Sequence, residues 1–189
     1  MMRRLVECVP NFSEGRRQEV IDAIVAPFRD TPRVALLDYR ADPDHNRLVV
    51  SLVGEPGPLQ ETLLQASRAA VALIDMRRHR GAHPRIGAVD VIPFVPLRHF
   101  TMEECVLLAR RFARRYADEL QIPVYLYESA AVRPEHRSLE QVRRGQFEAL
   151  ASEGLGSESR APDAGPSALH PSAGATAIGA RAIRINWPD

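Results

Sequence analysis

Residues 59–95 read LQETLLQASRAAVALIDMRRHRGAHPRIGAVDVIPFV, a stretch that joins an amphipathic segment to an apolar run through a short polar link. Apolar residues recur every three or four positions through its first half, which predicts a helix that runs to about Arg78. Gly81 and Pro84 are residues that end helices, so we expect the helix to stop before His83. The final AVDVIPFV is apolar and β-branched, which indicates a strand.

The same alternation of strands and helices extends to both sides of this stretch. Thr101 with Glu104, and Ser138 with Gln141, have the spacing of capping boxes, which begin helices. The expected strands are residues 5–9, 34–39, 48–53, 123–127 and 182–186, and the expected helices are residues 19–28, 101–120 and 138–150. This order predicts an α/β fold, an α+β sandwich in which helices pack on a mixed β-sheet.

Two segments lie outside this alternation. Residues 10–13 read PNFS, and we expect them to form a loop between the first strand and the first helix. Residues 151–174 are rich in Gly, Ser, Ala and Pro and show no periodicity. Because a loop of this length is usually functional or disordered, we expect one of these two states for it.

The composition is that of an ordinary globular domain. Hydrophobic residues make up 45% and charged residues 26% of the 189 residues, which is enough to build one packed core. The formal net charge of +1 provides no general attraction for nucleic acid or for an anionic membrane, so we expect neither as a partner. Phe112 and Tyr116 stand among arginines, but their spacing fits the apolar stripe of a helix.

Lysine and cysteine usage narrows the chemistry further. The sequence contains no Lys, which excludes a Schiff base or an amine nucleophile on a side chain. Cys8 and Cys105 lie in apolar runs, so we expect both to be buried and reduced. The apolar run at the start of the sequence is too short for a signal peptide, and no stretch approaches the 18 apolar residues of a membrane span, so we expect a cytoplasmic location.

His83 is the candidate residue for acid–base chemistry. Pro84 favours an extended backbone at the preceding residue, and Gly81 and Gly87 permit close turns on either side. An imidazole held in this way can act as a general base or acid. The alternative is a surface-loop histidine without a chemical task.

The segment DPDHNR, residues 42–47, joins two expected strands and is a second polar cluster. Asp and Asn favour turns, so a polar turn explains much of it. Asp42 or Asp44 is also a candidate to orient the ring of His83, because carboxylates commonly fix an imidazole tautomer.

A metal-dependent hydrolase is a competing interpretation of these residues. Its ligands would be Asp42, His45, His79 and His83. The helix that would present His79 and His83 together is interrupted by glycine and proline. We therefore expect no metal, and we expect His79 to face solvent.

Several segments together resemble glutamate formiminotransferase. They are LVECVPNFSEG (5–15), DPDHNR (42–47), LIDMRRHRGAHPRIGAVDVIPFVP (73–96), IPVYLY (122–127), APDAGPS (161–167) and GATAIGAR (174–181). The resemblance covers nearly the whole chain but only the first of the two subdomains in the family's catalytic unit. It implies that residues 1–180 form the amino-terminal subdomain and that residues 181–189 begin the first strand of a second subdomain.

The resemblance also implies an activity. Members of the family transfer a formimino group from N-formimino-L-glutamate to N5 of tetrahydrofolate in histidine breakdown, with tetrahydrofolate as cosubstrate and no metal. The family's catalytic histidine lies in an HPR motif, which matches His83. Arg47 and Arg85 are candidates to anchor substrate carboxylates, because a guanidinium pairs with a carboxylate through two hydrogen bonds. The folate-contacting loop of the family matches Gly165, Pro166, Ser167, Ala168, Leu169, His170, Pro171, Ser172, Ala173 and Gly174.

Two positions depart from the family pattern. Ala82 precedes the HPR motif where Glu is frequent, and Arg40 stands where some members carry an acidic residue. Arg40 would repel the imidazolium of His83 and lower its pKa, and Asp42 is a candidate to replace the missing acid.

A second interpretation keeps the fold without the catalysis. A chain with one wall of a two-walled site could act as a folate-binding or partner-binding module. In either case we expect a homo-oligomer or pairing with a second-subdomain protein.

Overall fold

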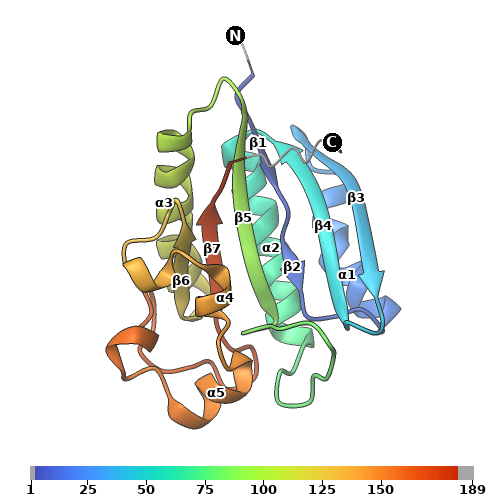
Figure 1. The fold of residues 1–189 in the computed structure, drawn as a ribbon. Coiled ribbons are helices and arrows are strands. Elements are labelled where there is room, and N and C mark those ends of the chain that lie inside the picture. The colour runs from blue at the N-terminus through green and yellow to red at the C-terminus, as the bar shows by residue number, and fades with distance from the viewer. Residues whose placement is uncertain (1–2, 183–189) are drawn as a thin grey trace, which may run out of the picture.

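The structure, a computed structural model that describes residues 3–182, contains one mixed sheet with helices on both faces (Figure 1). β1 and β2 lie together between β4 and β5, β3 forms the edge beyond β4, and β7 and β6 complete the other side. Pairing is antiparallel from β3 to β5 and parallel from β5 through β7 to β6. The strands are β1 (Leu5–Cys8), β2 (Asn11–Phe12), β3 (Val34–Asp42), β4 (Arg47–Gly54), β5 (Val89–Arg98), β6 (Val124–Glu128) and β7 (Thr176–Ala180). The expected mixed α/β fold is therefore confirmed.

Three long helices cover one face of the sheet (Figure 1): α1 (Gln18–Arg29), α2 (Pro56–Leu73) and α3 (Met102–Leu120). Thr101 and Glu104 form the expected capping box at the start of α3. Phe112 and Tyr116 are fully buried in the core beneath it, as their spacing predicted. Within residues 3–182, no helix combines the length and apolar character needed to cross a membrane.

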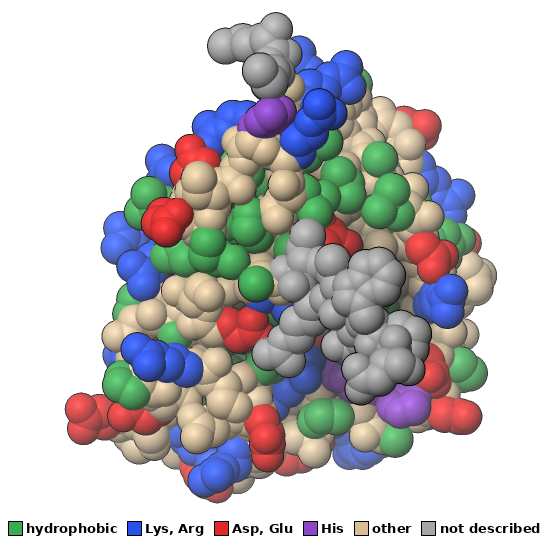
Figure 2. Space-filling view, turned by 45° about the horizontal axis from the view of Figure 1, so that its top comes forward, with side chains coloured by type: hydrophobic (Ala, Val, Ile, Leu, Met, Phe, Trp, Pro, Cys, Tyr) green, Lys and Arg blue, Asp and Glu red, His purple; other side chains and the backbone are tan. Residues whose placement is uncertain are grey.

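The other face of the sheet is only half covered. The short helix α4 (Leu139–Val142) lies in front of β6 and β7, and α5 (Gln146–Glu153) lies below the lower ends of these strands (Figure 1). Val142 of α4 and Leu150 of α5 belong to a second apolar cluster that includes Tyr125 and Tyr127. No helix of the described chain lies in front of β3 and β4 on this face. Alternate residues of β4 there are half-buried. Figure 2, which shows this side tilted forward, has patches of hydrophobic side chains among charged ones.

The first half of the chain corrects two expectations. The PNFS segment contains β2, in which Asn11 pairs with Val49 and Val91, so it continues the line of β1 beyond the interruption at Pro10. The helix α2 ends at Leu73 and not near Arg78. Its cap residue, Ile74, is buried and leaves the helix with an extended backbone. A separate turn then starts at residue 75, where the carbonyl of Asp75 accepts the N–H groups of Arg78 and His79.

The region after β6 also differs from the prediction. The expected helix over residues 138–150 is two helices, because Gly145 and Gln146 both adopt left-handed backbone angles, with φ of +75° and +59°. The side chain of Ser138 makes no capping hydrogen bond, so the second capping box is wrong.

The last strand comes earlier than expected. β7 occupies Thr176–Ala180, whereas residues 181 and 182 are not in a strand and the rest of the expected strand lies outside the described residues. β7 enters the sheet between β5 and β6. Its first residue, Thr176, donates a hydrogen bond from its hydroxyl to the carbonyl of Val89 at 2.8 Å and contacts the hydroxyl of Tyr116 at 3.0 Å.

Candidate active site

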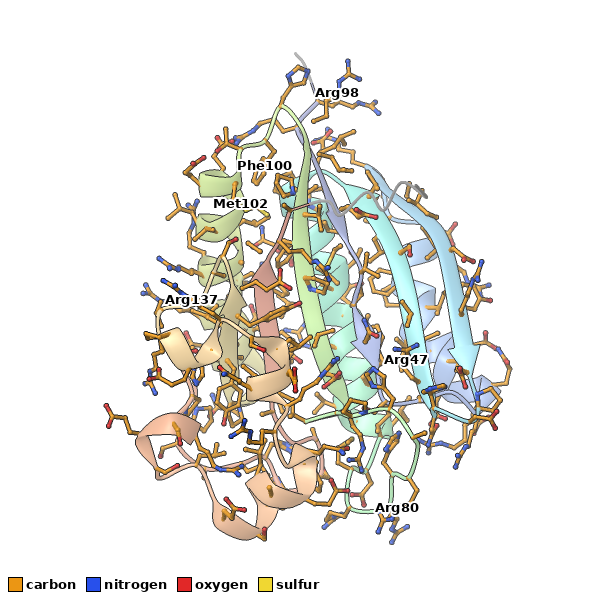
Figure 3. The ribbon with its side chains drawn as sticks, in the orientation of Figure 1. Arg47, Arg80, Arg98, Phe100, Met102 and Arg137 are labelled. Carbon is orange, nitrogen blue, oxygen red and sulfur yellow. The ribbon has the colours of Figure 1, made fainter. Side chains whose placement is uncertain are left out.

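His83 lies in the loop between α2 and β5. Figure 1 shows this loop at the lower end of the sheet. Figure 3 places Arg80 at the tip of this loop and Arg47 near the start of β4. A Cβ atom on Gly81 would stand 2.3 Å from the carbonyl oxygen of His45, so only glycine allows the loop to approach the DPDHNR turn this closely. The approach brings His83 and the DPDHNR turn together.

The groups around His83 carry mainly positive charge. The pKa of His83 is lowered to about 4, mainly by burial and then by the charges of Arg143, Arg47, His45 and Arg85, in that order. The half-buried ring is therefore neutral near pH 7 and able to accept a proton. A narrow gap beside the ring is lined by Phe12, Ser13, His45, Asn46, Arg47, His79, Arg85 and Asp90.

Arg143 and Asp90 form an ion pair at this gap. This pair was not predicted from the sequence. The Asp90 side chain is 2% exposed, and the Arg143 side chain is 15% exposed. Burial raises the pKa of Asp90, and the guanidinium of Arg143 opposes that rise. The backbone N–H of Ile86 donates to the same carboxylate at 2.9 Å. A single carboxylate inside the apolar run AVDVIPF was the signal that could have predicted a buried cation nearby.

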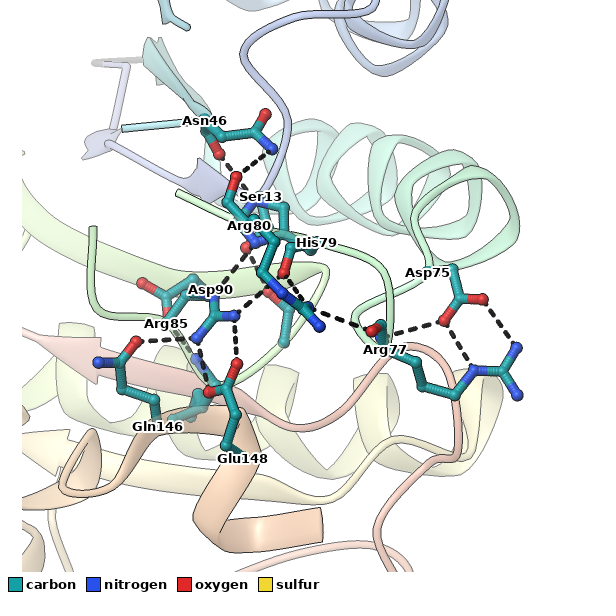
Figure 4. Close-up of polar contacts among 12 residues, drawn as sticks. Ser13, Asn46, Asp75, Arg77, His79, Arg80, Arg85, Asp90, Gln146 and Glu148 are labelled. Carbon is teal, nitrogen blue, oxygen red and sulfur yellow. Dashed lines mark hydrogen bonds and ion pairs between the residues drawn. The ribbon is translucent and has the colours of Figure 1, made fainter. Parts of the chain in front are cut away.

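His79 and Arg85 form a buried network, which corrects two expectations (Figure 4). Nε2 of His79 lies 3.0 Å from the carbonyl of Asn46, and Nε of Arg85 donates to Nδ1 of His79 at 3.1 Å. His79 therefore does not face solvent. Arg85 also pairs with Glu148 and donates to Gln146, so its guanidinium has no side left for a substrate carboxylate. Its role in the structure is to connect the histidine loop to α5.

The tautomer of His79 follows from these two bonds. Because Arg85 donates to Nδ1, the proton of the neutral ring lies on Nε2 and is donated to the carbonyl of Asn46. Burial lowers the pKa of His79, the carbonyl of Asn46 opposes the change, and the charge of Arg85 adds to it. His79 is thus a neutral structural residue that supports the loop carrying His83.

Asp42 contacts His45 and not His83. One oxygen of Asp42 lies 2.8 Å from Nδ1 of His45, and the other accepts the backbone N–H groups of Asp44 and His45. Arg40 is exposed and pairs with Asp38 at 3.0 Å. The pKa of His83 is therefore lowered by burial and by Arg143 and Arg47, and Arg40 is not among its causes.

The metal-site interpretation finds no matching geometry. In the described part of the chain, no three or more His, Cys, Asp or Glu side chains come together in a way that could hold a metal ion. Both ring nitrogens of His79 already have protein partners, so the proposed four-residue group does not form.

The loop from Gly165 to Gly174 ends against the strand that follows His83. Gly174 forms a β-bridge with Gly87, and the N–H of Ala88 donates to the carbonyl of Ala173 at 2.8 Å. The carbonyl of Ser172 accepts from the N–H of Met76 at 2.7 Å. Residues that are almost a hundred positions apart therefore lie side by side at one end of the sheet.

The fold and site define a mixed α/β domain in which a neutral histidine lies among arginines, and the residues after it pair with the end of a glycine-bounded loop. The chain belongs to the family described as "Formiminotransferase domain, N-terminal subdomain", whose sequence model matches residues 5–181.

Three relatives illustrate the similarity. The chain is 50% identical over 180 residues to the glutamate formimidoyltransferase of Streptococcus pyogenes serotype M1, covering 95% of this chain and 60% of that protein. It is 46% identical over 184 residues to the glutamate formimidoyltransferase of Thermoplasma acidophilum, covering 97% and 60%. It is 52% identical over 184 residues to the formimidoyltransferase-cyclodeaminase of Rattus norvegicus, covering 97% and 34%. The chain therefore spans at most 60% of the length of these three relatives.

Proposed function

We propose that this chain supplies one wall of a site that transfers a formimino group from N-formimino-L-glutamate to N5 of tetrahydrofolate. The observation that carries the proposal is the pairing of residues 86–88, just beyond His83, with residues 173–175 at the end of the candidate folate loop. This pairing sets a proton acceptor beside a loop that is expected to contact the pterin. Two relatives, which are 50% and 46% identical to this chain, are named glutamate formimidoyltransferase.

The proton steps suit a single neutral imidazole. N5 of tetrahydrofolate attacks the amidine carbon of the formimino group and becomes positively charged, so it must lose a proton. His83 accepts that proton, because its low pKa keeps it neutral beforehand. The carbon–nitrogen bond to glutamate then breaks, and the departing nitrogen takes the proton from His83. The ring returns to its starting state, and no other proton carrier is needed.

Arg47 is the proposed anchor for a carboxylate of the glutamate substrate. It lies beside the gap next to His83, it is half-buried, and its Nε atom has no hydrogen-bond partner among the described residues. Arg85 is not retained for this role because Glu148 occupies its guanidinium.

The cellular setting is part of the same proposal. Transfer from N-formimino-L-glutamate belongs to histidine breakdown and supplies one-carbon metabolism, and we place it in the cytoplasm. Cys8 and Cys105 are both free and buried, which fits a reducing compartment. The proposed second wall is a second subdomain that begins near residue 181 and covers the open half of the sheet.

The proposal is tested by completing the site. The chain is joined to the part of the Streptococcus pyogenes relative that lies outside the match, and formation of 5-formiminotetrahydrofolate is followed spectroscopically. We expect turnover that requires both the formimino donor and the reduced folate. A correctly folded fusion that binds folate but transfers nothing would favour the non-catalytic module instead.

A further inference from the structure

Asn46, in the DPDHNR turn, bonds to two other segments of the chain. Its Oδ1 accepts the backbone N–H of Gly15 at 2.9 Å, and its Nδ2 donates to the carbonyl of Arg80 at 3.0 Å (Figure 4). Its own carbonyl accepts from Nε2 of His79 at 3.0 Å. Asn46 is 8% exposed, so these bonds are shielded from water. One residue thus joins the segment that ends at Gly15, the turn, and the loop that carries the candidate histidine.

The backbone and the side chain of Asn46 both suit this position. Its φ of +49° is left-handed, a conformation that Asn adopts more readily than most residues with a side chain. Its amide provides an acceptor and a donor on one short side chain, and both are used. Glycine would keep the backbone conformation and lose both side-chain bonds. Aspartate would keep the acceptor and lose the donor.

Two glycines allow the three segments to approach one another around Asn46. A Cβ atom on Gly15 would stand 2.2 Å from the carbonyl oxygen of Asp42, and one on Gly81 would stand 2.3 Å from that of His45. Both distances are far below van der Waals contact, and both are to backbone atoms. The segments therefore meet backbone to backbone, and the amide of Asn46 bonds them where they meet.

The loop residues that Asn46 holds lead directly to His83. Arg80 stands three positions before His83 in the chain. His45 and Arg47, the chain neighbours of Asn46, line the same gap as His83, and both lower its pKa. The distance from the imidazole to these two groups therefore depends on how the loop is held against the turn.

We propose that Asn46 is a positioning residue, whose amide fixes the imidazole of His83 relative to Arg47. The proton acceptor and the candidate carboxylate anchor are then held in one geometry before substrates bind. Geometry that is set on folding lowers a barrier, because its entropy is not lost again in the reaction. The consequence for transfer rests on the proposed function, whereas the placement of the ring does not.

The rival explanation is that Asn46 only stabilises the turn. Removing its amide would then lower the unfolding midpoint and leave the surroundings of His83 as they are. The pKa of His83 separates the two roles, because it responds to the burial of the ring and to its distance from Arg47.

The test is Asn46→Gly in the isotope-labelled 189-residue chain, with the pKa of His83 followed by imidazole carbon resonances. Glycine keeps the left-handed backbone and the carbonyl that His79 uses, so only the amide is removed. We expect the pKa of His83 to rise from about 4 to at least about 5, because the ring gains water and moves away from Arg47. A pKa that stays at about 4 in the folded variant would overturn the proposal.

Gly81→Ala opens the same contact from the other side, and it decides the question if the Asn46→Gly chain does not fold. Its added methyl group meets the carbonyl of His45, so the pKa of His83 should rise in the same direction. Gln121→Gly is the matched control, because Gln121 also has a left-handed φ, of +55°, and also donates from its side chain to a backbone carbonyl, at the end of α3. An equal rise in the control would also overturn the proposal, since the pKa would then follow any loss of stability.

The active fusion separates this inference from the proposed function. There, Asn46→Gly should lower kcat about tenfold to 100-fold and should move the acid limb of kcat/KM upward with the pKa of His83. An unmoved limb with normal kcat would contradict the positioning role. A fusion that transfers nothing with Asn46 in place would count against the proposed function alone, because the pKa measurement needs no turnover.

Discussion

At the scale of single residues, the chain contains two neighbouring histidines with different environments. His79 is buried with both ring nitrogens bonded to protein, whereas His83 is half-buried among arginines whose charges lower its pKa. Both have lowered pKa values, and burial is the main cause in each case. The ring of His83 is the less buried of the two and has no hydrogen-bond partner among the described residues, which is why the proposed chemical role is assigned to it.

Replacing His83 by Asn tests this role. In an assembly that is active, we expect formimino transfer to fall by about 100-fold to 10,000-fold, because a positioned acid–base group is lost. Binding of reduced folate should persist. His99→Asn is the control, since His99 is exposed and its left-handed φ of +52° is one that Asn accepts. Near-normal turnover by the His83→Asn variant would return His83 to the interpretation as a surface-loop histidine.

The lowered pKa of His83 leads to a prediction about how the stability of the folded chain depends on pH. In the folded chain the pKa of His83 should be about 4, against an ordinary pKa of 6.5. A titration followed by the imidazole carbon resonances can measure it. Between these two values the unfolded chain binds a proton that the folded chain does not, so stability should fall as the pH drops through this window. His83→Asn should remove that part of the pH dependence.

Substitutions of Arg143 and Arg47 test the cause of the lowered pKa of His83. Arg143→Gln and Arg47→Gln should each raise the pKa of His83, because each removes a positive charge that acts on the ring. A folded Arg143→Lys variant should keep the pKa low. Unchanged pKa values in both Gln variants would mean that burial alone determines the protonation of His83.

At the scale of elements, the position of β7 decides how the candidate folate loop is held. The loop runs from the end of the Gly- and Ser-rich segment into β7, and β7 pairs parallel to β5 and β6. Its last residues bond to the strand after His83, whereas Gly165, Ser167 and Ala168 are exposed. The loop is therefore anchored at its carboxyl end and open to a ligand nearer its start.

Hydrogen exchange can test the loop. We expect the amides of residues 165–170 to exchange rapidly without ligand and to become protected when reduced folate is added, because contacts with a pterin would order them. The amides of Ala173, Gly174 and Ala175 serve as an internal reference, since they are hydrogen-bonded within the described structure. Equal exchange of residues 165–170 with and without saturating folate would count against a pterin-contacting role.

At the scale of the whole molecule, the sheet has one covered face and one half-open face. α1, α2 and α3 cover the first, and α4 covers only part of the second, in front of β6 and β7 (Figure 1). Arg47, at the start of β4, lies on the boundary of the open half (Figure 3). The chain spans 60% of the length of the two glutamate formimidoyltransferases. The remaining length of those proteins is enough for a second subdomain.

These 189 residues alone should therefore show little or no formimino transfer. Holding two substrates in reactive geometry can lower a barrier by about 7–11 kcal/mol, and one wall cannot hold both. An open site also lets water weaken the electrostatic contacts around His83. The partly apolar open face should favour self-association or pairing with a second subdomain. The measurements are the transfer assay and the mass in solution, and family-like turnover by a strict monomer would contradict this expectation.

The amino-acid sequence by itself determined much of the local structure and the placement of the candidate residue, His83, in a loop. Periodicity located α1, α3 and the central strands, Gly81 and Pro84 placed His83 in a loop, and Cys8 and Cys105 were expected in the core, where they lie. These features depend on neighbours within a few positions, and short-range propensity and spacing are visible in a sequence.

Only the tertiary structure decided which side chains meet. In the folded chain, His79 is buried and Arg85 pairs with Glu148. Asp42 contacts His45, and Arg143 pairs with Asp90. Each of these contacts, apart from that of Asp42 with its neighbour in the turn, joins groups from different elements. Their energies depend on burial and on charges that come together only when the sheet forms, because neither quantity is a property of sequence spacing.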